Sequence, residues 1–344
     1  MQISHYSPLE QVDVAVDLGL LPPPLPDIMT FSEMFHTDIP TPNILIEGIL
    51  HQGCKMILGG TSKSNKSWSL LDLAMSVASG EKWWGRNTTK SKVLYINFEL
   101  QPWAIKSRME SLCRARPECR QLGDQLHFWN LRGRNTDLSI MMPQLKEKLH
   151  ATNYGMIILD PAYKVLGDRD ENANGEVADL MNEFENLAQD TRAAIVLAHH
   201  FAKGDSTGKS ALDRMSGAGA WARDPDAILV MTPHETPDAF TVTSILRNVS
   251  PVPEFVVQLD FPIMRLAPDL NPEALRTPQS KNKLMTDEIF IETYLKDSPT
   301  RQSEIVRMGV KKGVSESSIN RYLERLSESG VIGKGSMGYW RKHE

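Results

Sequence analysis

The chain has 344 residues, of which 41% are hydrophobic and 24% charged, and its formal net charge is −5. This composition is typical of a soluble globular protein and excludes a disordered, collagen-like or disulfide-rich chain, while the acidic balance excludes a protein that coats nucleic acid with its whole surface. Three cysteines without C-x-x-C spacing indicate a reducing compartment. The chain has neither a basic, apolar leader nor an apolar run near the roughly 18 residues that span a bilayer, so we expect a cytoplasmic location and no membrane partner.

The first 44 residues are predicted to form an extended arm, because proline clusters at 22–26 and 40–42 disfavour long helices. From residue 45 to residue 266, short apolar runs alternate with longer amphipathic stretches, as in βαβ units. We therefore predict an α/β domain with a mostly parallel sheet. The predicted strands are Lys55–Leu58, Val93–Phe98, Met156–Leu159, Ala194–Ala198, Ala227–Met231 and Phe240–Leu246, and the predicted helices are Trp68–Ser79, Pro102–Cys113, Met142–Ala151 and Glu176–Arg192.

The strongest local motif lies between the first predicted strand and the first predicted helix. It matches the phosphate-binding loop G-x-x-x-x-G-K-[ST], except that Asn65 replaces the second glycine. Asparagine enters the left-handed backbone region more easily than most residues, so the loop tolerates this replacement. Backbone N–H groups would hold the phosphates of ATP, Lys66 would neutralise their charge and Ser67 would bind Mg²⁺. The candidate ATP-binding residues are Gly60, Thr61, Ser62, Lys63, Ser64, Asn65, Lys66, Ser67 and Trp68.

The motif also has alternatives. A turn rich in serine and lysine between a strand and a helix is the simpler interpretation. A second segment, 204–210, also ends in Gly-Lys-Ser, but it has only three residues between its glycines. We therefore reject it as a phosphate loop and read it as part of a basic loop.

Three later strands end in groups that complete such a site. Asp160 ends an apolar strand in the Walker B pattern and would hold Mg²⁺ together with Ser67. Glu99 follows another strand, 33 residues after Lys66, where it can orient or deprotonate water. The carboxyl ends of parallel strands face one ligand crevice, so these acids are expected to meet. Taken alone, an aspartate at a strand end is usually only a turn former. The alternative for Glu99 is an acid on the surface at a strand end, and the alternative for a histidine after the strand 194–198 is packing under the next loop.

Together these motifs resemble the RecA/DnaB-like hexameric P-loop ATPases, in particular the AAA_25-like group of RepA-type replicative helicases. The resemblance is carried by the stretches GGTSKSNKSWSLLDLAMSVASG, VLYINFEL, MIILDP, AIVLAHH and SGAGAWARDPDAILVM. It implies a RecA-like core, ATP and Mg²⁺ as cofactors and a homohexameric ring. It also implies roles for single residues: Lys66 and Ser67 on nucleotide and Mg²⁺, Glu99 as catalytic base, Asp160 as Walker B acid, His199 as sensor and Arg247 as arginine finger.

The finger assignment has a rival. Arg247 would reach into the site of the neighbouring subunit, but Ile245 stands where the family often has a helper lysine, and Arg223 is the alternative finger.

Two regions are candidates for nucleic-acid binding. The segment 201–219 is rich in glycine and serine, and it carries three cations that would hold single-stranded DNA in the central channel of a ring. Its alternative is a plain surface loop. The segment from 281 to the end has 12 Lys/Arg and 9 Asp/Glu, a net charge of +3 against −8 for the rest. The candidate DNA-binding residues are Lys203, Lys209, Arg214, Arg321, Lys334 and Arg341.

The C-terminal region is predicted to be a separate small domain. Residues 267–283 are polar and proline-rich and are interpreted as a linker. Residues 284–344 then give three helices, Met285–Lys296, Thr300–Met308 and Ser315–Glu328, and a hairpin at Val331–Trp340. This order is typical of a winged helix, which would bind duplex DNA through Arg321 and the wing or contact a protein partner.

Three functions follow from these patterns. The first is an ATP-driven ring motor, such as a RepA/DnaB-like replicative DNA helicase of a mobile element or phage. The second is an ATP-gated DNA-binding regulator or loader that does not unwind DNA. The third is a winged-helix protein whose phosphate loop is inactive, with Asn65 as its only support.

Overall fold

A computed structural model describes residues 25–134, 137–150, 152–167, 169–200, 219–276, 287–295, 299–311, 315–335 and 338–342. The chain divides into an N-terminal unit, 1–43, and a second unit, 44–344. Within the second unit, residues 44–276 (the α/β core) and residues 287–342 (the C-terminal unit) have separate hydrophobic clusters. None of the helices in the described residues combines the length and the apolar composition of a bilayer span.

In the described part of the predicted extended arm, residues 25–44, a short helix forms, α2 (Phe31–His36). Thr30 caps it, since the Thr30 hydroxyl accepts from the Glu33 backbone and the Glu33 carboxylate accepts from the Thr30 N–H in return. This capping box satisfies two backbone donors and explains why a helix begins there. No residue of α2 is buried within the chain.

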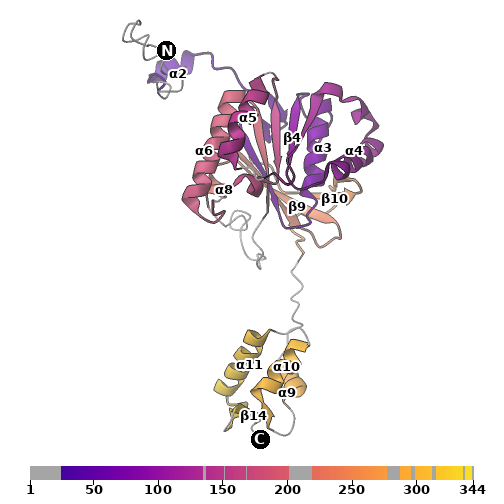
Figure 1. Cartoon of the computed structure of the whole chain (residues 1–344), viewed down its shortest axis with the longest axis vertical. Helices are drawn as coiled ribbons and strands as arrows, with labels where there is room; N and C mark the ends of the chain where they lie inside the picture. Colours follow the sequence, from indigo (N-terminus) through magenta and orange to yellow (C-terminus); the bar gives the residue numbers. More distant parts are fainter. Residues whose placement is uncertain are drawn as a thin grey trace. The chain divides into compact units, whose positions relative to one another are not determined.

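A nine-stranded sheet forms the centre of the α/β core, in the order β11-β10-β9-β8-β3-β7-β6-β4-β5 (Figure 1). The six strands from β8 to β5 are parallel, while β9, β10 and β11 add an antiparallel extension. The predicted α/β class and mostly parallel sheet are confirmed. The strands are β3 (Lys55–Gly60), β4 (Val93–Asn97), β5 (Leu126–Asn130), β6 (Met156–Asp160), β7 (Ala194–His200), β8 (Ala227–Pro233), β9 (Ala239–Leu246), β10 (Phe255–Asp260) and β11 (Ile263–Leu266).

Helices cover both faces of this sheet (Figure 1). On one face, α3 and α4 pack in a cluster that includes Leu70 and Ile105. On the other, α5 and α6 pack in a cluster that includes Leu145 and Leu180. Both faces of the central strands are therefore buried, which is why those strands read as continuous apolar runs. The helices are α3 (Lys66–Ser79), α4 (Pro102–Ala115), α5 (Leu138–His150), α6 (Asn174–Thr191) and α8 (Ala220–Arg223), with 3-10 turns η2 (Pro117–Gln121), η3 (Gly123–Gln125) and η4 (Ala162–Val165); β1 (Ile44–Ile46) and β2 (Leu50–His51) form a separate hairpin.

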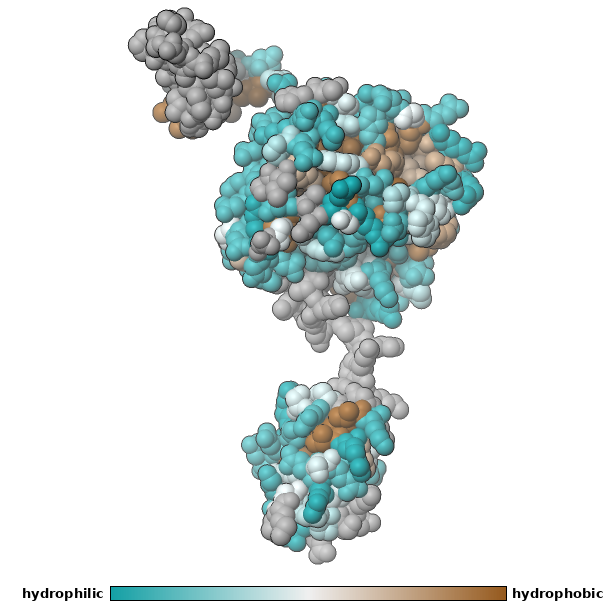
Figure 2. Space-filling model, viewed as in Figure 1, coloured by the Kyte–Doolittle hydropathy of each residue, from teal (hydrophilic) through white to brown (hydrophobic). Residues whose placement is uncertain are grey.

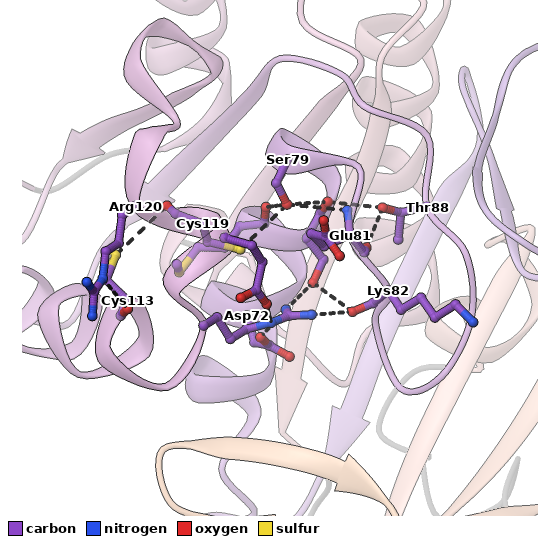
Figure 3. A network of polar contacts seen from close by, with 12 residues as sticks. Asp72, Ser79, Glu81, Lys82, Thr88, Cys113, Cys119 and Arg120 are labelled. Atoms are coloured by element: carbon purple, nitrogen blue, oxygen red, sulfur yellow. Dashed lines mark hydrogen bonds and ion pairs between the residues drawn. The ribbon is translucent and has the colours of Figure 1, made fainter.

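A polar network fixes α3, the helix that begins at the phosphate loop, against the segment after α4 (Figure 3). Asp72 of α3 accepts from the guanidinium of Arg116 at 2.6 Å, and Arg116 also donates to Ser76 Oγ at 2.5 Å and to the carbonyl of Lys82. Burial raises the pKa of Asp72 to about 6, against the opposing effect of Arg116. A buried carboxylate needs such a partner, so the pair specifies how α3 and the end of α4 meet.

The predicted linker differs from the structure in its first part. Residues 271–276 lie against the β8–β9 turn, where the Glu235 N–H donates to the carbonyl of Ala274 and the Arg276 N–H donates to the carbonyl of Pro233, both at 2.9 Å. The ring of the buried His234 lies 2.9 Å from the carbonyl of Asn271. The proline-rich sequence therefore supplies hydrogen-bond partners to the buried His234 and to the backbone of the β8–β9 turn. Residues 277–283 lie outside the described residues.

In its described residues, the C-terminal unit combines three helices with a three-stranded antiparallel sheet of order β12-β14-β13. Its own core contains Phe290, Tyr294, Leu323 and Trp340, all nearly or fully buried. Teal, hydrophilic side chains cover most of its visible face, with one brown group (Figure 2). The helices and hairpin lie close to their predicted positions, while their interpretation as a winged helix stays a prediction. The elements are α9 (Asp287–Tyr294), β12 (Thr300–Arg301), α10 (Gln302–Lys311), α11 (Glu316–Glu328), β13 (Ile332–Lys334) and β14 (Tyr339–Lys342).

Candidate active site

The carboxyl ends of β3, β7, β6 and β4 lie side by side in the sheet. Gly60 at the end of β3 is in register with His200 at the end of β7, and Asn97 at the end of β4 is in register with Asp160 at the end of β6. The loops that leave these strands therefore gather at one edge, as expected for a ligand site in a parallel sheet.

The loop between β3 and α3 has the backbone that the sequence suggests. Asn65, at the N-cap of α3, has φ 59° and ψ 22°, which confirms the predicted left-handed conformation. Lys63 is also left-handed, with φ 66°. A side chain at Gly60 would place Cβ 2.7 Å from Ser64 Oγ and 3.2 Å from the carbonyl of Met231, so any larger residue would displace the Ser64 side chain or the β8 backbone. The loop thus leads directly into a helix N-terminus, the usual backbone cradle for phosphate.

Lys66 is folded into this loop and is only 5% exposed. Its Nζ donates to the carbonyls of Gly60 at 3.0 Å and Thr61 at 2.9 Å, and it lies 3.2 Å from Nδ1 of His200. Burial lowers the pKa of Lys66 to about 8, although the negative charges of Asp160 and Glu99 act in the opposite direction. The ammonium is still mostly charged at neutral pH, so the loop contains a buried positive charge.

Ser67 and Asp160 are brought together, as the sequence predicts. The Asp160 carboxylate accepts from the Tyr95 hydroxyl at 2.6 Å and from the Ser67 hydroxyl. Burial raises the pKa of Asp160, whereas these two hydrogen bonds lower it. Among the described residues no group of three or more His, Cys, Asp or Glu side chains could hold a metal by itself. A serine hydroxyl beside one carboxylate instead fits Mg²⁺ that is also bound by substrate phosphates.

Glu99 lies just after β4, where its side chain is exposed at the same edge. The hydroxyl of Tyr163, from η4, donates to Glu99 Oε1. Burial raises the pKa of the Tyr163 phenol, and the neighbouring Glu99 charge adds to this effect. Tyr163 was not among the predicted residues. Its position three residues after Asp160 could have indicated it, because residues just after the end of a parallel strand lie near the same crevice.

The two adjacent histidines point to opposite faces of β7. His199 is 6% exposed and stacks on Trp221 with ring centroids 4.4 Å apart. Burial lowers the pKa of His199 to about 4, so this imidazole is neutral. His200 instead contacts Lys66. The structure therefore brings His200, and not the predicted His199, to the phosphate loop, because neighbouring residues of a strand alternate between its faces.

The two candidate arginine fingers lie next to each other, at the amino ends of the parallel strands, whereas the phosphate loop lies at their carboxyl ends. Leu246 at the end of β9 pairs with Ala227 at the start of β8, and Arg247 follows it. The exposed Arg247 donates from its guanidinium to the carbonyl of Arg223, and its N–H donates to the carbonyl of Asp226 at 2.9 Å. Neither arginine is therefore brought to the phosphate loop of its own chain.

The predicted nucleic-acid residues divide into two groups. Lys203, Lys209 and Arg214 lie outside the described residues. Arg321 on α11, Lys334 on β13 and Arg341 on β14 are all exposed in the C-terminal unit. Arg341 stands opposite Gly333 in the hairpin. Arg301, which the sequence analysis did not single out, lies with its guanidinium 5.2 Å from the ring centroid of Tyr339 on the same small sheet.

Comparison with known proteins identifies the core. Residues 22–206, more than half of the chain, match the AAA domain family AAA_25. The chain belongs to this family. The family match and the geometry of the loop together identify this part of the chain as a P-loop ATPase domain. ATP is the expected ligand of such a domain.

Solved structures add likenesses of fold. One is a KaiC-like protein from the hyperthermophilic archaeon Pyrococcus horikoshii OT3, with 11% identity over 65% of this chain and 94% of that chain and a TM-score of 0.47. Another is the ATPase domain of G40P, with 8% identity over 61% of this chain and 82% of that chain and a TM-score of 0.44. Both scores are below 0.5, and nothing about function follows from either likeness. No curated protein matches the chain significantly.

Proposed function

We propose that this chain is an ATP-hydrolysing, ring-forming nucleic-acid motor of the RepA/DnaB type, acting as a replicative DNA helicase. The observation that carries the hydrolytic part is the convergence of Lys66, Ser67, Glu99 and Asp160 at one edge of the sheet, around a loop with the backbone of a phosphate cradle. A cation, a hydroxyl–carboxylate pair and a second carboxylate are the groups that phosphoryl transfer to water requires.

Each group has a separate task in hydrolysis. The loop N–H groups bind the phosphates, and Lys66 leaves the carbonyls of Gly60 and Thr61 to contact the β- and γ-phosphates. Ser67 and Asp160 would hold Mg²⁺, which when bound supplies further positive charge to the phosphate oxygens. Glu99 accepts a proton from the attacking water. His200 lies beside Lys66 and is the better candidate for sensing the γ-phosphate.

The proposed mechanism needs a second copy of the chain. An arginine that neutralises transition-state charge is commonly supplied by another subunit or protein. Arg247, or its neighbour Arg223, fits this role because both side chains are exposed. Both lie at the start of β8, at the other end of the strands from the phosphate loop of their own chain. A head-to-tail contact of this kind can close into a ring, for which we propose six subunits with single-stranded DNA in the centre, held by Lys203, Lys209 and Arg214.

The hydrolytic part is tested by the change Lys66→Ala in the full chain. We expect Mg²⁺-dependent phosphate release from ATP by the wild type and none above background by Lys66→Ala, because the loop loses its only buried cation among the described residues. The exposed Lys106 on α4 offers the control, and Lys106→Ala should hydrolyse ATP at the wild-type rate. Equal phosphate release by the wild type and Lys66→Ala would contradict the assignment of this loop.

We propose further that the C-terminal unit is a winged helix that binds duplex DNA. Its net positive charge and the exposure of Arg321, Lys334 and Arg341 support this role. Changing all three to glutamine should weaken DNA binding and reduce the slope of log affinity against log salt by roughly 2 to 3, since each phosphate contact contributes about 0.9. The ATPase rate without DNA should not change. A matched control changes three exposed cations of the core to glutamine: Lys90, Lys106 and Arg114.

Binding of a protein instead of DNA is the other possible role of this unit. An unchanged DNA affinity and salt slope in the triple variant would contradict the DNA-binding role.

A second candidate function is an ATP-gated DNA-binding regulator or loader. The compact C-terminal unit, which has a hydrophobic core of its own, favours it. Strand separation on a forked duplex distinguishes the two. The motor predicts separation that requires ATP hydrolysis, whereas the regulator predicts ATP-dependent binding of the fork without separation.

A further inference from the structure

Tyr163 occupies the short turn η4, which directly follows Asp160 and Pro161. Its neighbours Ala162 and Val165 are fully buried in the cluster on the α5–α6 side of the sheet. These two side chains anchor the turn to the core, so the backbone of Tyr163 is held in place next to the Walker B strand.

The side chain of Tyr163 lies between two parts of the candidate site. Its hydroxyl donates to Glu99 Oε1. Its ring centroid lies 6.2 Å from that of His200, the residue that contacts Lys66, and the Nζ of Lys164 lies 5.0 Å from the same ring. Tyr163 is thus the described side chain that connects the proposed base with the group beside the loop lysine.

Glu99 is held at its other end by Asn97. The buried Asn97 accepts from the backbone N–H groups of Glu99 at 3.3 Å and Leu100 at 2.9 Å, and it donates to Asn130 Oδ1 at 3.0 Å. The backbone of the turn is therefore fixed, whereas the Glu99 side chain is exposed and has several rotatable bonds of its own. Without a second attachment, its carboxylate would sample many positions.

We propose that Tyr163 is a positioning residue for Glu99: its hydroxyl fixes one carboxylate oxygen and leaves the other free to accept a proton from the attacking water. This inference rests on the proposed role of Glu99 as base. The water oxygen forms a bond to the γ-phosphorus, the bond to the ADP oxygen breaks, and the water proton moves to the free oxygen of Glu99. A base must lie within hydrogen-bond reach of this water. The protein should therefore hydrolyse ATP faster when the Glu99 carboxylate is fixed than when it rotates freely.

The test compares Tyr163→Phe with Tyr154→Phe in the full chain. Tyr154 is a matched control because its hydroxyl contacts His127, away from Glu99. We expect Tyr163→Phe to lower kcat about tenfold while KM and ATP affinity stay within twofold, because the lost hydroxyl does not bind the nucleotide. Tyr154→Phe should leave kcat unchanged.

A double variant decides whether Tyr163 acts through Glu99. In Glu99→Gln protein, adding Tyr163→Phe should change the residual rate less than twofold, because residues that act as one unit are not additive. A further tenfold loss there would overturn the inference. So would a wild-type kcat in Tyr163→Phe when Glu99→Gln is inactive, a result that leaves the role of Glu99 intact. If Glu99→Gln itself keeps the wild-type rate, the role of Glu99 fails and that of Tyr163 fails with it.

Discussion

Glu99→Gln is expected to bind ATP and Mg²⁺ like the wild type and to hydrolyse ATP about 10²- to 10⁴-fold more slowly. Glutamine has nearly the same shape as glutamate, and Glu99 is exposed, so the fold should be unaffected. The amide cannot accept a proton from water, whereas Lys66, Ser67 and Asp160 still bind the phosphates and the metal ion. Single-turnover phosphate release gives the rate, and equilibrium titration with ATP gives the affinity.

Glu110→Gln is the control for this prediction. Glu110 is an exposed glutamate on α4, paired only loosely with Lys106 at 4.0 Å. The Glu110→Gln protein should hydrolyse ATP at the wild-type rate, because this substitution removes the same charge from the same domain without changing the phosphate-binding site. A Glu99→Gln protein that is as fast as Glu110→Gln would show that another group deprotonates the water.

Arg247→Ala is the second change with a large expected effect. An arginine finger contributes about 10³-fold or more to phosphoryl transfer, and the loss should be of that size if Arg247 acts on the γ-phosphate of a neighbouring subunit. The change should not disturb the site of its own chain, because Arg247 lies at the amino ends of the parallel strands. The Asp226 carbonyl, which accepts from the Arg247 N–H, would still hold the backbone.

Mixed oligomers test whether the site is shared. Combining Lys66→Ala with Arg247→Ala chains should restore part of the hydrolysis, since some interfaces then pair an intact loop with an intact finger. Arg114→Ala, at an exposed position of α4, is the arginine control and should be fully active. Arg223→Ala tests the rival finger: a large loss there, together with normal hydrolysis by Arg247→Ala, would move the role to Arg223. Mixed rings without any recovery would contradict a shared site.

The central strands and the loop were predictable because their chemistry is local. β3, β4 and β6 are buried on both faces, so each is a continuous apolar run, and the phosphate loop is contiguous in the sequence. The left-handed conformation of Asn65 follows from its residue type. Of the strands in the large sheet, β5, β10 and β11 were missed, because β5 and β11 are its edge strands and all three are only partly buried, which interrupts the apolar pattern.

Other features depend on contacts between segments that are distant in sequence. Which of the two histidines meets Lys66 depends on the register of β7 against β3, and the sequence alone does not show that register. Likewise, the contact of Tyr163 with Glu99 joins residues 64 positions apart. The docking of 271–276 on the β8–β9 turn uses backbone groups, which leave no trace in the pattern of side chains.

The central claim is that ATP is bound and hydrolysed at the edge of the sheet that carries Lys66 and Glu99. The most direct test is the identity of the nucleotide that each protein retains after incubation with ATP and Mg²⁺ and rapid removal of free nucleotide. We predict mainly ADP on the wild type, intact ATP on Glu99→Gln and no nucleotide above background on Lys66→Ala. As much nucleotide on Lys66→Ala as on the wild type, or ADP in wild-type proportion on Glu99→Gln, would contradict the claim.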